Sequence, residues 1–246
     1  MKKLLIATAV LLTTPITAFA GADFVEGDRT FAADAELGAT VTTGNTESSS
    51  TKARLDMKHE LGNWENQYLL EALYKEDDGE VTGKRFYGLI QADYKFTEND
   101  YIFFNANHEV DPFTGFESTT IASFGYGHKF INTEKTLLAV EVGPGYRYKR
   151  LDQESALVAG YEIENGWIGH AVMNFERKIS DTSKFKQMFV ADIGDNVEGR
   201  SETSITANIA GALAMKFAVI VRYNDAPLED KKSTDTETNL TLLYSF

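Results

Sequence analysis

The chain has 246 residues, 43% of them hydrophobic, which allows one large domain or two small ones. Its formal net charge of −13, without a basic stripe, excludes a phosphate backbone as ligand, so no nucleic acid partner is expected. It contains no cysteine, which excludes disulfides, lipid attachment through a thiol and thiolate metal sites.

The first twenty residues have the features of a secretory signal. Lys2 and Lys3 precede an apolar run at 4–12, and Ala18 and Ala20 occupy the two positions that a signal peptidase reads. A retained anchor helix, the alternative, needs about 20 apolar residues, and this run is shorter. We therefore expect 1–20 to be a cleaved signal peptide, 21–30 a short periplasmic segment and 31–246 the folded domain.

Beyond residue 30, apolar and polar residues alternate with a period of two. In Thr51–Leu61, the apolar positions alternate with Lys, Arg, Asp and Glu, and a helix would spread those charges over its whole surface. The pattern predicts a strand. Gly62-Asn63 follows and is typical of a two-residue hairpin turn.

This turn fixes the register between the two strands that it joins. Apolar residues then face apolar residues on one surface, and Arg54 lies opposite Glu71 on the other. The same register sets Glu60 against Glu65, a like-charge pair that water at the rim of the sheet would screen.

The same pattern predicts about twelve strands, an even number, as single-chain bacterial barrels require. No later apolar stretch is long enough for a membrane helix, which excludes a helical membrane protein. The expected strands are Phe31–Val41, Thr51–Leu61, Trp64–Lys75, Arg85–Phe96, Tyr101–Val110, Thr119–Phe130, Leu137–Lys149, Trp167–Ile179, Phe185–Ile193, Glu202–Leu213, Phe217–Asn224 and Thr234–Phe246.

Short and long connections alternate along the chain, as they do where every second turn of an up-and-down barrel faces the periplasm. The expected short turns are Gly62-Asn63, Thr97–Asp100, Ile131–Thr136, Ser180–Lys184 and Ala214–Lys216. The expected long, mostly acidic loops are Thr42–Ser50, Glu76–Lys84, Asp111–Ser118, Arg150–Gly166, Gly194–Ser201 and Asp225–Ser233.

Aromatic residues collect at both ends of these strands, as in the two girdles of a membrane barrel. Near the short turns they are Trp64, Phe96, Tyr101, Phe130, Phe185, Phe217 and Phe246, and near the long loops Tyr74, Phe86, Tyr146, Tyr148, Trp167 and Tyr223. We predict an all-β fold, an antiparallel up-and-down transmembrane β-barrel of about twelve strands. A secreted soluble all-β protein is the alternative.

Two short motifs carry a family resemblance. Thr43-Gly44-Asn45-Thr46 and Gly143-Pro144-Gly145-Tyr146-Arg147-Tyr148 resemble segments of the DUF481 family, also described as YdiY-like or putative salt-induced outer-membrane proteins. A final strand ending on Phe246 also resembles the closing strand of bacterial outer-membrane barrels, whose terminal Phe is read by the barrel-assembly machinery. The resemblance implies an outer-membrane location and a link to salt or envelope stress. It carries over no catalytic or ligand residue.

The residues themselves give a structural reading of both motifs. Gly44-Asn45 can adopt positive φ in a turn, and Gly143 and Gly145 permit strand bending or the close approach of a loop. The inward-facing positions of the strands are charged, with both signs interspersed, and twelve strands enclose a narrow channel at most. The residues expected to line the lumen include Lys52, Arg54, Glu71, Arg85, Asp93 and Arg147.

Catalytic and metal sites are not predicted. His59 and His128 fall on the apolar face, and His108, followed by Glu109 near the outer rim, is the best of the catalytic candidates. The acidic segments at 76–80 and 228–230 lack the spacing of a calcium loop.

The predicted function is therefore a narrow channel or a structural envelope component in the outer membrane, without a cofactor. The alternative is an outer-membrane enzyme that acts on lipid or peptide at the outer rim. The expected partners are outer-membrane lipids, lipopolysaccharide and the assembly machinery, and the barrel is expected to be a monomer.

Overall fold

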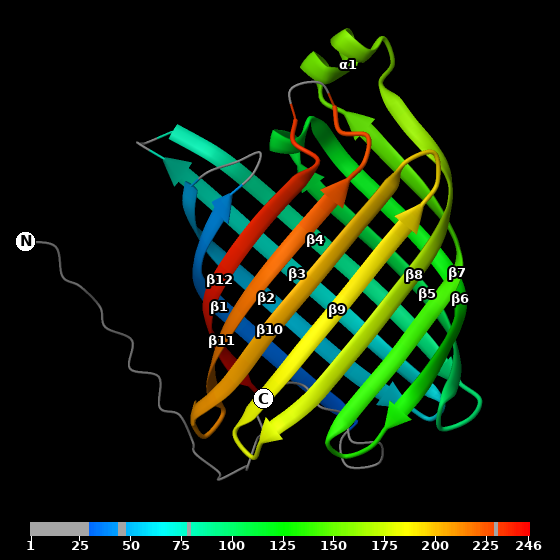
Figure 1. Cartoon of the computed structure of the whole chain (residues 1–246), viewed down its shortest axis with the longest axis vertical. Helices are drawn as coiled ribbons and strands as arrows, with labels where there is room; N and C mark the ends of the chain where they lie inside the picture. Colours follow the sequence, from blue (N-terminus) through cyan, green and yellow to red (C-terminus); the bar gives the residue numbers. More distant parts are fainter. Residues whose placement is uncertain (1–29, 44–47, 78–79, 229–230) are drawn as a thin grey trace, which may run out of the picture.

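The computed structural model describes residues 30–246 except 44–47, 78–79 and 229–230, so the predicted signal peptide lies outside the described residues. In the described part, twelve strands close into one antiparallel barrel (Figure 1). Each strand pairs with its sequence neighbours, and β1 closes the barrel against β12. The predicted fold class, an up-and-down barrel of about twelve strands, is confirmed.

All twelve predicted strands are present, and most extend beyond the predicted ends. They are β1 (Phe31–Thr43), β2 (Ser48–Leu61), β3 (Trp64–Asp77), β4 (Glu80–Lys95), β5 (Asp100–Asp111), β6 (Phe116–Asn132), β7 (Thr136–Leu151), β8 (Ile163–Ser180), β9 (Ser183–Ile193), β10 (Val197–Ala210), β11 (Leu213–Asn224) and β12 (Thr234–Ser245).

The predicted register of the β2–β3 hairpin is confirmed, with Arg54 opposite Glu71 and Glu60 opposite Glu65. The last pair is not left to solvent screening. Lys95 Nζ lies 3.5 Å from a carboxylate oxygen of Glu60 and 3.9 Å from one of Glu65, so a lysine of β4 compensates the like charges.

Several predicted connections have other bounds in the structure. The turn between β10 and β11 is Gly211-Ala212, where Gly211 has a φ of +55°, and not Ala214–Lys216. Five of the six long loops are shorter than predicted because the strands continue outward; β8, for example, begins at Ile163 rather than Trp167. The loop Asp225–Ser233 has the predicted bounds. The β7–β8 connection holds α1 (Gln153–Ala159), capped by Asp152, and β5 leads into a 3-10 turn, η1 (Pro112–Thr114).

The barrel is apolar outside and polar inside. Trp64, Phe130 and Phe246 are exposed at the end with the short turns, and Phe86 and Trp167 toward the other end, as predicted for the girdles. Tyr101 is an exception, because its ring faces the interior and is 4% exposed. In the described residues, no helix has the length and apolarity needed to cross a membrane.

Strands β6 and β7 approach each other closely where the Gly143-Pro144-Gly145 motif lies. A methyl group added to Gly143 would sit 2.7 Å from Gly125 Cα, and one added to Gly125 would sit 2.7 Å from Gly143 Cα and 2.9 Å from the Phe103 ring. Real side chains do not fit at such distances from a backbone, so the two strands meet only because both positions are glycine. The predicted close approach is therefore to a strand and not to a loop.

Candidate functional site

The interior of the barrel is the candidate site. Its wall consists of alternate strand positions, many of them charged and buried. A cavity of about 420 Å³ lies inside. Residues of β2 to β12 and of the outer loops line it. Its geometry follows from three groups of side chains.

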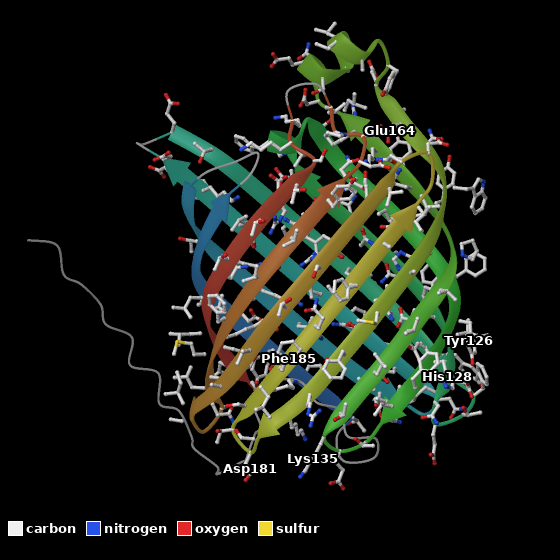
Figure 2. The ribbon with its side chains drawn as sticks, in the orientation of Figure 1. Tyr126, His128, Lys135, Glu164, Asp181 and Phe185 are labelled. Atoms are coloured by element: carbon white, nitrogen blue, oxygen red, sulfur yellow. The ribbon has the colours of Figure 1, made fainter. Side chains whose placement is uncertain are left out.

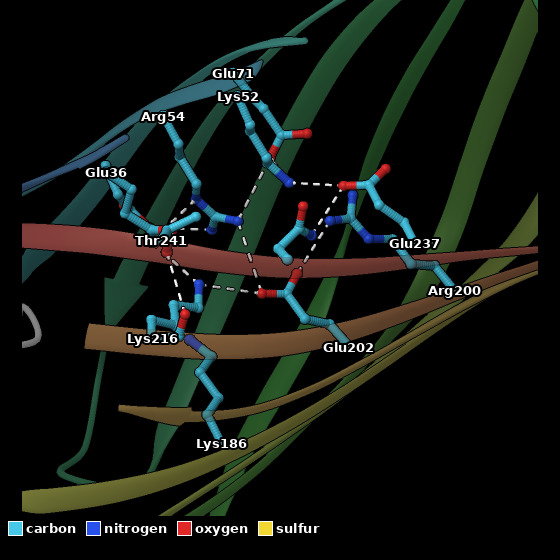
Figure 3. A network of polar contacts seen from close by, with 12 residues as sticks. Glu36, Lys52, Arg54, Glu71, Lys186, Arg200, Glu202, Lys216, Glu237 and Thr241 are labelled. Carbon is cyan, nitrogen blue, oxygen red and sulfur yellow. Dashed lines mark hydrogen bonds and ion pairs between the residues drawn. The ribbon is translucent and has the colours of Figure 1, made fainter. Parts of the chain in front are cut away.

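The first group, which we call the ion-pair cluster, joins side chains of β1 to β4 to side chains of β10 to β12 (Figure 3). Six cationic side chains meet five carboxylates. The members are Glu36, Lys52, Arg54, Asp56, Glu71, Arg85, Arg200, Glu202, Lys216, Arg222 and Glu237.

One half of this cluster is built on two carboxylates. Lys52 Nζ lies 3.0 Å from Glu71 and 3.0 Å from Glu237, and an Arg85 terminal nitrogen lies 2.8 Å from Glu71 and 3.0 Å from Glu237. All four side chains are at most 4% exposed. Each charge has at least two opposite partners, which buried charges need if they are to stay ionised.

The other half uses Glu36 and Glu202. Lys216 Nζ lies 3.1 Å from Glu36 and 3.4 Å from Glu202, and Arg54 lies 4.0 Å and 3.8 Å from the same two carboxylates. Arg54 belongs to β2 and Glu202 to β10, with three strands between them in the barrel. The cluster thus reaches across one side of the lumen. Five of its members also line the cavity: Arg54, Glu71, Arg200, Glu202 and Arg222.

The second group lies on β4, β5 and β7. Gln91 Nε2 is 3.1 Å from an oxygen of Asp93 and 3.1 Å from an oxygen of Glu141, so one amide serves two carboxylates. The Tyr101 hydroxyl donates to Glu141 at 2.9 Å, and Asn105 donates to Gln91 at 3.1 Å. These donors are neutral, in contrast to the cations of the ion-pair cluster.

His170 and Asp192 lie on the same side of the lumen, on β8 and β9. His170 Nδ1 is 2.6 Å from Asp192 Oδ1, and the imidazole packs 6.1 Å from the ring of Phe103. No sequence pattern predicts a role for His170. The signal that could have found it is the β8–β9 register, which sets His170 opposite Asp192.

The third group lies toward the outer loops. Arg147 and Lys149 of β7 both pair with Glu198 of β10, the former at 3.3 Å. Asn196 donates to Glu198 at 3.1 Å and to Asn224 at 3.0 Å. This group joins strands on two sides of the outer end of the lumen.

The structure divides the six predicted lumen residues among these groups. All six side chains point inward from their strands, but they do not form one site. Four belong to the ion-pair cluster, Asp93 to the carboxylates on β4 and β7, and Arg147 to the outer group.

The remaining candidates do not assemble into a catalytic or metal site. His108 faces outward, with Nδ1 2.8 Å from Thr120 Oγ1, whereas Glu109 lines the cavity. His128 also faces outward, at the end with the short turns, beside Tyr126 and 2.7 Å from Asp100 (Figure 2). Among the described residues, no group of three or more His, Asp or Glu is arranged to hold a metal ion. Parts of the two acidic segments, 78–79 and 229–230, lie outside the described residues.

The comparisons with known proteins agree with the fold. The family described as "Protein of unknown function, DUF481" matches residues 35–246. The Escherichia coli K12 protein described as "Uncharacterized protein YdiY" is 24% identical over 229 residues, which are 91% of this chain and 86% of that protein.

Among solved structures, the NanC porin has a TM-score of 0.54 at 8% identity, over 85% of this chain and 98% of that one. The translocator domain of the autotransporter NalP from Neisseria meningitidis has a TM-score of 0.53 at 9% identity, over 90% of each chain. At these identities the likeness concerns the barrel fold.

Proposed function

The chain belongs to the DUF481 family, and we propose that it forms a narrow channel in the bacterial outer membrane for small ions and polar solutes. The observation that carries the proposal is the extent of the cavity of about 420 Å³. Glu65 and Leu137 line it near the short turns, and Leu228 and Lys231 line it near the outer loops. A passage along the barrel axis needs such a cavity.

The charges on the lining fit a passage of weak selectivity. Its Lys and Arg residues number ten, and its Asp and Glu residues also number ten. A formally neutral lining gives no strong preference for one sign of ion. The ion-pair cluster borders the cavity and fills part of the lumen, which restricts the passage to small solutes.

The test is conductance in planar lipid bilayers. The purified, folded protein should give small, persistent current steps. Val190→Trp should reduce them because Val190 lines the cavity, whereas Ala191→Trp, at the next position and on the outer surface, should not. A folded barrel without current would favour a structural envelope component instead.

Location and partners are part of the same proposal. We infer that the chain is secreted and loses residues 1–20. The assembly machinery then inserts it into the outer membrane as a monomer, where lipids and lipopolysaccharide surround its apolar exterior. The closed barrel supports the monomer, because it leaves no strand edge to pair with a second copy. Membrane fractionation and the amino-terminal sequence of the mature protein test these points.

The link to salt or envelope stress rests on the family resemblance alone. We expect more of the protein in cells shifted to high salt, as measured by quantitative immunoblotting. An amount unchanged by salt would remove this part of the proposal. No observation favours the enzyme alternative, since His108 and Glu109 lie on opposite surfaces of β5.

A further inference from the structure

A cluster of polar side chains lies on the outer surface of the barrel, at the end with the short turns. Asp100 Oδ1 accepts from the Tyr126 hydroxyl and lies 2.7 Å from His128 Nδ1. Asp100 Oδ2 accepts from the Thr97 hydroxyl at 2.7 Å. The β5–β6 register sets Asp100 opposite His128, and Tyr126 and His128 project outward (Figure 2). Ionisable side chains cost free energy on a surface that faces lipid, so this cluster is a candidate binding site.

His128 keeps one ring nitrogen available to a ligand. Asp100 accepts three hydrogen bonds, as an ionised carboxylate does, so Nδ1 of His128 is the nitrogen that carries the proton. In the neutral ring, Nε2 then has a lone pair and is an acceptor. This atom has no hydrogen-bond partner among the described residues and is not buried, and the His128 side chain is 34% exposed. Because His128 projects from the outer face of β6, a lipid molecule can reach its Nε2.

Aromatic rings lie around this imidazole. The Phe130 ring is 4.8 Å from it, edge to face, and the Tyr126 ring is 6.4 Å from it on the other side along β6. The Phe96 ring lies 6.4 Å from that of Tyr126. These three rings are between 45% and 63% exposed. Aromatic faces attract cations, and the Asp100 carboxylate adds a negative charge, so the place suits a positively charged group that carries N–H donors.

The charges of the two neighbouring turns select the same kind of headgroup. Asn132 Nδ2, at the end of β6, lies 3.5 Å from the Glu98 carbonyl oxygen, so the β4–β5 turn contacts the β6–β7 side of the cluster. Glu98 and Glu134 lie in these turns, against one cation, Lys135. With Asp100 the local excess is negative. An anionic headgroup is therefore repelled, and an ammonium is attracted.

We propose that this cluster binds the ammonium end of an ethanolamine phospholipid. One ammonium N–H donates to His128 Nε2, and the positive charge faces Asp100 and the rings of Tyr126 and Phe130. The acyl chains then follow the apolar outer surface of β5 and β6, where Ile102 and Phe124 are more than half exposed. The proposal rests on the proposed location in a membrane and does not depend on conduction.

The first test is a competition between two lipids for the folded protein in detergent. Phosphatidylethanolamine and phosphatidylcholine with the same acyl chains are added in equal amounts, and the lipids that stay bound are counted by native mass spectrometry. The two headgroups have the same charges, but choline has no N–H. The bound ratio should favour ethanolamine by about fivefold, the factor that ~1 kcal/mol for one hydrogen bond represents.

Two histidine variants locate the effect. His128→Phe keeps an aromatic ring but removes Nε2, and it should bring the ratio close to one. The matched control is His59→Phe. His59 also lies on the apolar face near a short turn, but it faces Phe31 and Asn66 and has no carboxylate opposite, so its loss should leave the ratio unchanged.

The second test needs no variant. Diethylpyrocarbonate acylates a free imidazole nitrogen, and the modified histidine is identified by peptide mass. Phosphatidylethanolamine should slow the reaction of His128 severalfold more than phosphatidylcholine does, with His59 as the internal control. Equal protection by the two lipids and a bound ratio near one would mean that the cluster only ties β5 to β6, and the inference would be wrong. A preference unaffected by His128→Phe would also overturn it. Recovery of the protein outside the membrane fraction of cells would remove the proposed location, whereas these outcomes remove the site alone.

Discussion

The ion-pair cluster predicts a large loss of stability when Glu237 is replaced by Gln. Glu237 is 3% exposed and contacts Lys52 and Arg85 at 3.0 Å and Arg222 at 3.6 Å. The substitution keeps the size of the side chain and removes its charge. The cluster would then hold six cations and four carboxylates instead of five.

Breaking a buried ion pair by removing one partner costs about 3–5 kcal/mol, because the other charge stays in a poorly solvated place. Here Lys52 and Arg85 both keep Glu71, at 3.0 and 2.8 Å. We therefore expect the lower end of the range, a loss of about 3 kcal/mol in the free energy of unfolding. The second substitution Arg85→Gln, added to Glu237→Gln, should cost less than the sum of the single changes, since it removes one of the stranded charges.

The assay is equilibrium unfolding by urea in lipid vesicles, followed by the fluorescence of Trp64 and Trp167, which lie on the outer surface. The matched control is Glu117→Gln. Glu117 pairs with Arg150 at 3.1 Å, but both side chains are more than half exposed, so we expect a loss of at most about 1 kcal/mol. If Glu237→Gln lost no more than Glu117→Gln, the cluster would be well hydrated and the account of a dry, charge-filled half of the lumen would be wrong.

Three further predictions concern packing, orientation and electrostatics. Gly143→Ala should destabilise the barrel by about 1–3 kcal/mol through the clash with Gly125. The control Gly169→Ala should be tolerated, because its added methyl group would lie 3.7 Å from the nearest atom. Equal unfolding midpoints of the two variants would contradict the close contact between the strands. An epitope tag at Gly160 should be labelled on intact cells, and one at Asn63 only after the outer membrane is opened, so surface labelling at Asn63 would invert the barrel. Any cation preference caused by the acidic outer loops should fade as the salt concentration rises from about 0.01 M to 1 M, because the Debye length falls from roughly 30 Å to 3 Å. A reversal potential that does not change with salt would place the preference inside the lumen.

The sequence predicts the strands well because a strand between lipid and water must alternate along its whole length. It predicts a turn well only where residues that favour turns interrupt the alternation of apolar and polar positions. Gly62-Asn63 does so, and its hairpin register is confirmed. Around Gly211 the residues are small and apolar on both sides, so the alternation fades before the turn, and the predicted position is displaced.

The candidate site is harder to predict because it depends on register between strands. A β-bulge between Lys178 and Ser180 shifts the β8–β9 pairing, and only the shifted register brings His170 opposite Asp192. The contact of Arg54 with Glu202 depends on closure of the whole barrel, which no local pattern contains. Alternation therefore shows which side chains face inward, and closure decides which of them meet.

The glycines of the family motif are explained by the barrel wall. Gly143 and Gly125 let two strands approach, and the space above Gly125 is taken by Phe103, whose ring packs against His170. A methyl group at Gly125 would lie 2.9 Å from the Phe103 ring, so that ring would have to shift.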